Sequence, residues 1–241
     1  MLQPSINANW KKLLLVNYPI KKTLLEPFLP QYTEFALWNN SCYISLVGFL
    51  FLDVKFAGIE IPLHTNFVEI NLRFYVRRRT NNEWKYGVVF LKEIVGLPMV
   101  SFVANTFFNE HYETMPVGYN LSRNSEELVL EYRWKKNEWN SIQIHTEPEM
   151  IPIEEGSQED FFTEQHWGYT KLKNDSTREY SVLHPKWNMY KIKNYSINVD
   201  FGKVFGNQFN FLSNQNPESV FLAEGSEITL HKHTTIRNPK I

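Results

Sequence analysis

Cysteine is almost absent from this sequence of 241 residues. The single cysteine, Cys42, cannot form a disulfide within the chain, so nothing in the sequence favours an oxidising compartment. We therefore expect a reduced, cytoplasmic protein. Cys42 also has no base close to it in the sequence, and a cysteine nucleophile needs one.

Long apolar runs and an excess of one charge are absent as well. The longest apolar run, residues 46–52, is far shorter than the roughly 20 residues that cross a bilayer. The apolar run at residues 13–16 is too short for a signal peptide. The formal net charge of -1 leaves no basic surface for nucleic acid or anionic lipid, and the arginines at 77–79 are interpreted as a solvated strand edge. The sequence thus predicts neither a nucleic-acid partner nor a membrane partner.

Cofactor motifs are missing too. The chain has no glycine-rich phosphate loop, no dinucleotide fingerprint and no hydrolase arrangement, so no cofactor is expected. His231 and His233 share one face of an expected strand, but they lie close to the C-terminus, where exposure is the ordinary outcome. We therefore expect no metal site.

The segment 67–77 carries the clearest pattern in the chain. Apolar residues at the even positions alternate with polar ones at most odd positions, which is the period of a strand with one wholly apolar face. The other face carries Glu69, Asn71 and Arg73, and it either meets water or lines a polar cavity. Asn81 and Asn82 favour a turn, after which residues 86–94 read as the returning strand of a hairpin.

The remaining patterns indicate an α+β fold. Behind Pro98, apolar residues recur at helical spacing to residue 107, and Ser157 with Asp160 favours a second helix start. Segments 34–38 and 43–54 are expected to form a hairpin, and 201–211 belongs to the strand-rich tail. About a dozen strands against three or four helices predict one domain, residues 1–241, with a mostly antiparallel, barrel-like sheet.

Five segments of the chain carry a recognisable pattern in their order and spacing: 24–30, 69–76, 87–91, 161–170 and 184–187. Together they resemble the DUF2071 (YqjF-like) family, in the acetoacetate decarboxylase-like superfamily. The resemblance implies that superfamily's antiparallel barrel or cone with a few flanking helices. It also implies that Glu69 and Glu93 match glutamates that face the site in the decarboxylases.

Residues 92–100 resemble the decarboxylase signature Arg-Glu-x-x-x-x-Pro-Lys-Lys, whose first lysine forms a Schiff base. Met99 and Val100 stand at the two lysine positions. A thioether cannot condense with a ketone, so the resemblance implies that Schiff-base decarboxylation is absent here. Lys92 stands where an arginine is usual; it is either a replacement nucleophile or a salt-bridged structural lysine.

These observations predict a pocket for a small polar or carboxylated molecule. It would be lined by Glu69, Asn71, Arg73 and Glu93, because an acid and a guanidinium on one face can hold such a ligand. The alternative for these residues is a structural ion-pair ladder with partners on neighbouring strands. Lys92 and His184 are further candidates for contact, while no residue is assigned to catalysis. The protein would then be a binding protein or an acid–base enzyme.

The alternative is a structural or partner-binding domain whose ancestral pocket is filled by aromatic side chains. Aromatic residues make up 15% of the chain, which is enough to fill such a pocket. The same richness permits a homodimer without requiring one.

Overall fold

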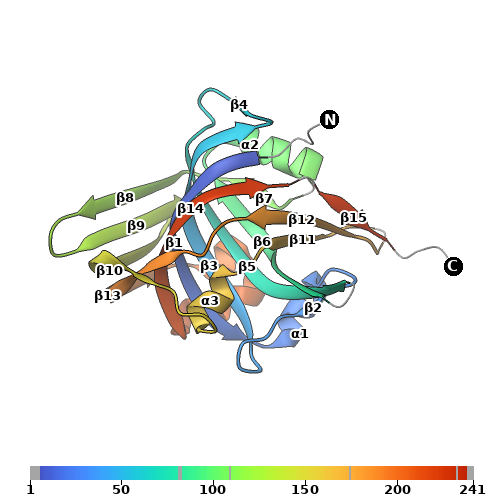
Figure 1. Ribbon diagram of the computed structural model, residues 1–241. Coiled ribbons are helices and arrows are strands. Elements are labelled where there is room, and N and C mark those ends of the chain that lie inside the picture. Colours follow the sequence, from blue (N-terminus) through green and yellow to red (C-terminus); the bar gives the residue numbers. More distant parts are fainter. Residues whose placement is uncertain (1–5, 81–82, 109, 174, 232, 238–241) are drawn as a thin grey trace.

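The computed structural model describes residues 6–80, 83–108, 110–173, 175–231 and 233–237 (Figure 1). Within these ranges, fifteen strands belong to one sheet and short helices pack around it. The predicted α+β class with a mostly antiparallel sheet is confirmed. Asn81 and Asn82, where a turn was predicted, lie outside the described residues.

Seven strands pair in a closed circuit. The order β12-β11-β6-β5-β3-β1-β14 is completed by a pairing of β12 with β14, so this part of the sheet returns on itself. We call this circuit the ring, and its inner face is the face that Tyr75 and Tyr180 share. The strands of the ring are β1 (Ile6–Ile20), β3 (Cys42–Phe56), β5 (Phe67–Thr80), β6 (Glu83–Val95), β11 (Trp167–Lys171), β12 (Thr177–Leu183) and β14 (Ser219–Leu230).

The remaining strands extend from the ring or pair at its edges. In Figure 1, β8 and β9 project to the left of the ring, and the sheet order continues from β14 through β13 and β10 to them. These outer strands are β13 (Asn188–Asn198), β10 (Trp139–Pro152), β9 (Leu128–Lys135) and β8 (Val117–Arg123). Short strands are β2 (Glu34–Phe35), β4 (Ile59–Glu60), β7 (Tyr112–Thr114) and β15 (Thr234–Ile236).

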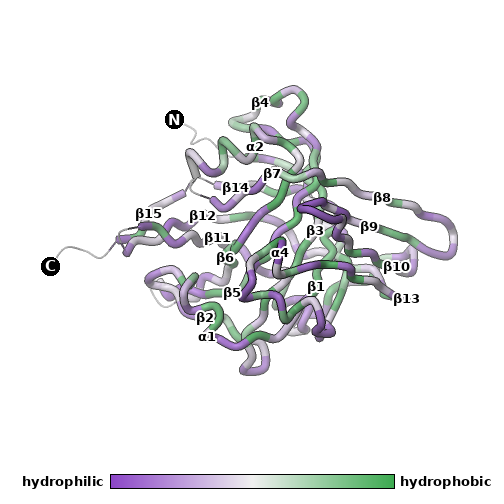
Figure 2. Tube along the Cα trace, turned by 180° about the vertical axis from the view of Figure 1, so that it is seen from behind, coloured by the Kyte–Doolittle hydropathy of each residue, from purple (hydrophilic) through white to green (hydrophobic). Residues whose placement is uncertain are grey.

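Two apolar cores lie on opposite faces of the ring strands. The outer core packs Ile70 and Leu72 of β5 against β9 and β10, and the inner core contains Val47, Phe49 and Tyr75. Figure 2 shows β3, in the middle of the molecule, as a mainly hydrophobic strand, as expected for a strand that is covered on both faces. Burial on both faces means that polar side chains on the inner face lie inside the protein.

The helices are short and cover the ring at several places. Pro98 begins a helix, and Ser157 caps another by accepting a hydrogen bond from the Asp160 amide, as predicted. The helices are α1 (Lys22–Leu25), α2 (Pro98–Val103), α3 (Gln158–Thr163) and α4 (Phe201–Phe205). Helical segments of other types are η1 (Glu26–Phe28) and η3 (Asn207–Asn214), which are 3-10 helical, and η2 (Ala104–Phe108), which is π-helical.

Two assignments made from the sequence are wrong. Segments 34–38 and 43–54 do not pair as two strands of a hairpin. The predicted turn is present, because Trp38 and Ser41 form an antiparallel bridge across it, but Glu34 and Phe35 pair with Arg77 and Val76 of β5. Segment 201–211 is helical rather than extended, since its buried residues recur at three-residue to four-residue spacing and Asp200 caps the helix.

Gly87 is required where β6 meets β11. A Cβ atom at this position would lie 2.2 Å from the Trp167 carbonyl oxygen, across the parallel pairing that joins the two strands. We expect Gly87→Ala to lower the free energy of unfolding in urea by about 1–3 kcal/mol, because the strands must move apart. Gly118→Ala is the matched control, since its nearest neighbour would be the Arg133 side chain at an ordinary 3.5 Å. Equal stability of the two variants would contradict this account of the ring.

Candidate functional site

Glu69, Asn71 and Arg73 point to the inner face of the ring. They alternate with the outer-core residues of β5, and their exposed fractions are 2%, 1% and 8%. The interpretation of this face as water-exposed is therefore wrong. Glu93, on β6 directly opposite Asn71, is 3% exposed and joins them. Four of the predicted site residues thus form one buried polar cluster, which we call the inner cluster.

A bulge in β6 decides which of two neighbouring residues reaches the inner cluster. The register shifts by one residue between the pairs Leu72–Lys92 and Arg73–Phe90, so Leu91 is the extra residue. As a result Lys92 lies opposite the outer-core residue Leu72, and Glu93 turns inward. Without the bulge, strand alternation would put Lys92 on the inner face.

Lys92 has structural partners on the outer face. Its Nζ donates to the Val204 carbonyl oxygen at 2.6 Å and pairs with Glu113 Oε2 at 2.8 Å. The structure thus does not bring Lys92 to the inner cluster. These contacts agree with the salt-bridged structural lysine that was one of the two interpretations of this residue.

Hydrogen bonds fix the orientation of Glu69. The Asn71 side-chain amide donates to Glu69 Oε1 at 3.1 Å, and the Tyr112 hydroxyl donates to Glu69 Oε2 at 2.9 Å. Burial raises the pKa of Glu69 to about 7, although these two hydrogen bonds and the charge of Arg73 act in the opposite direction. Glu69 therefore keeps its proton to a higher pH than an exposed glutamate does.

Two groups of the site were missed in the sequence, Glu110 and Tyr112. They precede and begin β7, a three-residue strand that pairs in parallel with the end of β6. The Thr170 hydroxyl donates to the Glu110 carboxyl at 3.2 Å, and burial raises the pKa of Glu110 to about 7. Burial, followed by the negative charges of Glu110 and Glu69, also raises the pKa of Glu93. Three carboxyl groups thus hold protons at pH values where exposed carboxyls are ionised.

Arg73 is a buried cation that forms no ion pair with the described residues. Its only hydrogen bond among the described residues is a long one, 3.4 Å, from Nη2 to the Phe162 carbonyl oxygen. Its guanidinium carbon also lies 5.7 Å from the centre of the Tyr75 ring. No carboxylate of the described residues lies within ion-pair distance, and the Nε–H group has no partner there. A buried charge in this state is costly unless something else pairs with it.

The polar groups just beyond Arg73 are satisfied. Ser45, its cross-strand neighbour on β3, hydrogen-bonds to Asn17 Oδ1 at 2.5 Å and to the Tyr75 hydroxyl at 2.6 Å. Asn17 in turn donates to the Ser219 hydroxyl at 3.0 Å. Buried atoms without a hydrogen-bond partner thus occur in the inner cluster, at Asn71, Arg73 and Glu93. The side chains of Asn17, Ser45 and Tyr75 beside it have none.

Aromatic rings from α3 fill another part of the ring interior. Phe162 is fully buried, and its ring centre lies 5.0 Å from that of Tyr75 and 5.3 Å from that of Tyr43. Its neighbour Phe161 also packs against Tyr75. The Phe162 backbone carbonyl is the one that reaches Arg73, so α3 borders the inner cluster.

His184 lies near Arg73 in a stack of rings. Its ring centre is 4.5 Å from that of His166 and 4.3 Å from that of Trp187, and Nδ1 donates to the Pro185 carbonyl oxygen at 2.9 Å. Burial lowers the pKa of His184 to about 4, and the charges of His166 and Arg73 act in the same direction. The imidazole is therefore neutral at physiological pH, and its contact with a ligand stays a prediction.

Met99 lies away from the inner cluster. It is on α2 and is 57% exposed, in a helix whose only buried residue is Ser101. That Met99 stands at the reactive lysine position of the decarboxylases stays a prediction. Its thioether provides no amine for a Schiff base in either case.

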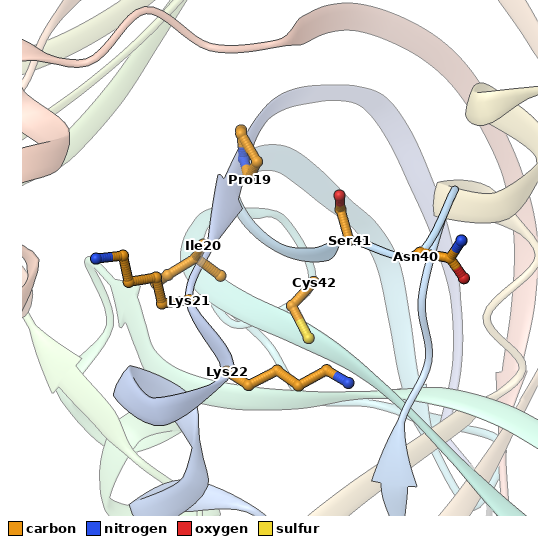
Figure 3. Close-up of a pocket in the computed structure, with 7 residues that line it drawn as sticks. All are labelled: Pro19, Ile20, Lys21, Lys22, Asn40, Ser41 and Cys42. Carbon is orange, nitrogen blue, oxygen red and sulfur yellow. The ribbon is translucent and has the colours of Figure 1, made fainter.

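A separate open pocket lies on the surface between β1 and the start of β3 (Figure 3). Its volume is about 350 Å³, and Cys42 and Lys22 both border it. Burial raises the pKa of the Cys42 thiol, with Lys22 acting in the opposite direction, so the thiol is protonated at neutral pH. The pocket contains none of the predicted site residues. Its lining consists of Pro19, Ile20, Lys21, Lys22, Asn40, Ser41 and Cys42.

The ring and its flanking helices define the acetoacetate decarboxylase-like fold. The acetoacetate decarboxylase of Legionella pneumophila has a TM-score of 0.67 at 9% identity, with 97% of this chain and 87% of that chain covered. An acetoacetate decarboxylase-like enzyme from Sphingomonas wittichii has a TM-score of 0.62 at 10% identity, covering 97% and 92%. The enduracididine biosynthesis enzyme MppR, in complex with pyruvate, gives 0.63 at 8% identity, covering 99% and 92%.

The chain belongs to the DUF2071 family, whose model, described as an uncharacterized conserved protein, matches residues 7–227. The resemblance found in the sequence is thereby confirmed. Comparison with curated proteins gives no match. In the described part of the chain, none of the helices is long and apolar enough to cross a membrane.

Proposed function

We propose that the inner cluster binds a small carboxylated molecule through Arg73. The observation that carries this proposal is the buried guanidinium, whose Nε–H has no partner and which has no carboxylate within ion-pair distance among the described residues. A ligand carboxylate would supply both the missing hydrogen bonds and the missing charge, and arginine can hold one with two parallel bonds. Asn71, Glu69 and Glu93 line the same face and would contact the rest of the molecule.

The carboxyl groups of the cluster suit acid–base chemistry. Burial raises the pKa of Glu69 and of Glu110 to about 7, which is close to the optimum for a group that both gives and takes a proton at neutral pH. Such groups can move a proton on a bound molecule without any covalent intermediate. This is how the protein could act as an enzyme without the Schiff-base lysine.

A solved structure of similar fold supports the choice of ligand class. MppR has been solved in complex with pyruvate, a small carboxylate, although its 8% identity extends the likeness to the fold alone. The buried, disulfide-free Cys42 agrees with the reducing cytoplasm in which we infer that the protein acts.

A thermal-shift screen tests the proposal. Small mono- and dicarboxylic acids are compared with the neutral amides of the same shape, at pH 7. A carboxylate at 100 times its Kd should stabilise the protein by about 2.7 kcal/mol, which corresponds to roughly 5–10 °C for a chain of this size. The matching amides should give no shift. If no acid shifts the midpoint, the filled, partner-binding domain becomes the better account, and the aromatic packing around Phe162 would favour it.

A further inference from the structure

Two buried oxygen atoms of the inner cluster have no hydrogen-bond partner among the described residues. The Asn71 amide group donates to Glu69, which fixes the orientation of the side chain and leaves Oδ1 as an acceptor. Glu93 Oε2 also lacks a partner among the described residues. Asn71 and Glu93 are directly opposite in the β5–β6 register, where Cβ atoms are about 4.5–5.5 Å apart. The groups that would satisfy these two atoms together are hydrogen-bond donors.

The charges around this pair point to a cationic donor. Glu93 faces two more carboxyl groups, Glu69 on its neighbouring strand and Glu110 ahead of β7, and both raise its pKa. The cations that act on these carboxyls are Arg73 for Glu69 and Arg178 for Glu110. The remaining titratable neighbours, Tyr112 of β7 and Tyr180 of β12, have raised pKa values because of burial and are neutral. A positively charged group beside Glu93 would offset the negative charge that these three carboxyl groups carry when ionised.

We propose that the ligand is a small zwitterion, with its carboxylate on Arg73 and a protonated amine between Asn71 Oδ1 and Glu93 Oε2. This inference rests on the proposed function and adds the second half of the recognised molecule. Arg73 and Asn71 are two residues apart on one strand, hence roughly 7 Å apart along it, so both ends of a short amino acid can be held at once.

Binding of the amine is linked to proton release. An ammonium ion beside the cluster favours the ionised carboxylate, so a carboxyl group that holds a proton in the free protein gives it to solvent as the ligand enters. The complex then contains the carboxylate and the ammonium ion as an ion pair, and one proton appears in the buffer. A carboxylate ligand without the amine brings no such release.

Calorimetric titration with matched ligand pairs tests the inference. Glycine, 3-aminopropanoate, 4-aminobutanoate and 5-aminopentanoate are each compared with the unsubstituted acid of the same chain length, at pH 7. We expect at least one amino acid to bind about 10-fold more tightly than its matched acid. Repeating that titration in two buffers of different ionisation enthalpy should reveal a released proton for the amino acid only.

Variants separate the two ends of the ligand. Glu93→Gln should reduce the affinity for the amino acid to that of the matched acid in the same variant. Glu113→Gln, on the outer face beside Lys92, is the control and should change neither. The comparison within the wild-type protein decides the matter even if Glu93→Gln does not fold.

The outcomes distinguish this inference from the proposed function. If acids and amino acids bind equally and both require Arg73, the amine site is wrong and the carboxylate site stands. Alkylamines of the same chain lengths are titrated in the same way. If they bind as tightly as the amino acids, the proposal that the site holds both ends of the ligand is wrong. If none of these compounds binds, both proposals fail.

Discussion

Arg73→Met should abolish the binding of small carboxylates and, at the same time, stabilise the ligand-free protein. Removing one partner of a buried charge pair typically costs about 2–5 kcal/mol, so the affinity should fall about 30-fold or more. In the free protein the guanidinium is buried and pairs with no carboxylate of the described residues, and methionine fills a similar volume without a charge. We expect the free energy of unfolding to rise by about 1–4 kcal/mol, as when buried charges are replaced by apolar groups.

Urea denaturation of the free proteins and titration with the best carboxylate measure the two effects. Arg77→Met is the matched control, because Arg77 lies on the same strand but pairs with the half-exposed Glu34 at the surface. The control should keep its ligand affinity and change the stability by less than about 1 kcal/mol. A destabilised Arg73→Met that still binds carboxylates would show that Arg73 is a structural residue.

Glu69→Gln should remove a large part of the pH dependence of stability. The pKa of Glu69 is about 7 in the folded protein and 4.5 in the unfolded chain, so the folded state keeps a proton that the unfolded state loses between these values. The stability of the wild type is therefore greater below pH 4.5 and declines as the pH rises through 7. The contribution of Glu69 to this decline is about 3 kcal/mol. Glutamine keeps the shape of the side chain and cannot ionise.

The measurement is the free energy of unfolding of both proteins between pH 4.5 and 8. Relative to the wild type, the variant should gain stability as the pH rises. His184 titrates in both proteins and cancels in the difference. Glu93 and Glu110 lose the charge of Glu69 beside them in the variant, so their own pKa values fall and the pH dependence decreases further. Glu83→Gln, an exposed carboxyl on β6, should follow the wild type throughout. Parallel curves for Glu69→Gln and wild type would mean that Glu69 is ionised in the folded protein.

The sequence predicted that Glu69, Asn71 and Arg73 share one face of the strand, because one physical rule determines it. Strand alternation places Glu69, Asn71 and Arg73 on one face, and the apolar alternate positions indicate which face is polar. Whether that face is inside could not be derived from the strand itself. It depends on the pairing of β12 with β14, two strands that are far from β5 in the sequence.

Other parts of the site depend on contacts that no local pattern encodes. The bulge at Leu91 reverses the faces of Lys92 and Glu93, and the sequence of β6 carries no glycine or proline there to mark it. Glu110 and Tyr112 reach the site through a parallel pairing of a three-residue strand, which is too short to have a period. Segment 201–211 was misassigned, although the helical spacing of its buried residues was present in the sequence.

The most direct test of the central claim is the nitrogen NMR signal of the Arg73 Nε–H group. In protein with labelled arginine, this signal is assigned by its disappearance in Arg73→Met. It reports on a donor that has no hydrogen-bond partner among the described residues of the free protein. The account predicts that titration with a carboxylate from the screen moves this signal to the position of a charge-assisted hydrogen bond. The midpoint of this change should fall at the Kd found by calorimetry. If the carboxylate binds and the Arg73 signal stays where it was, the ligand lies elsewhere and the assignment of the site is wrong.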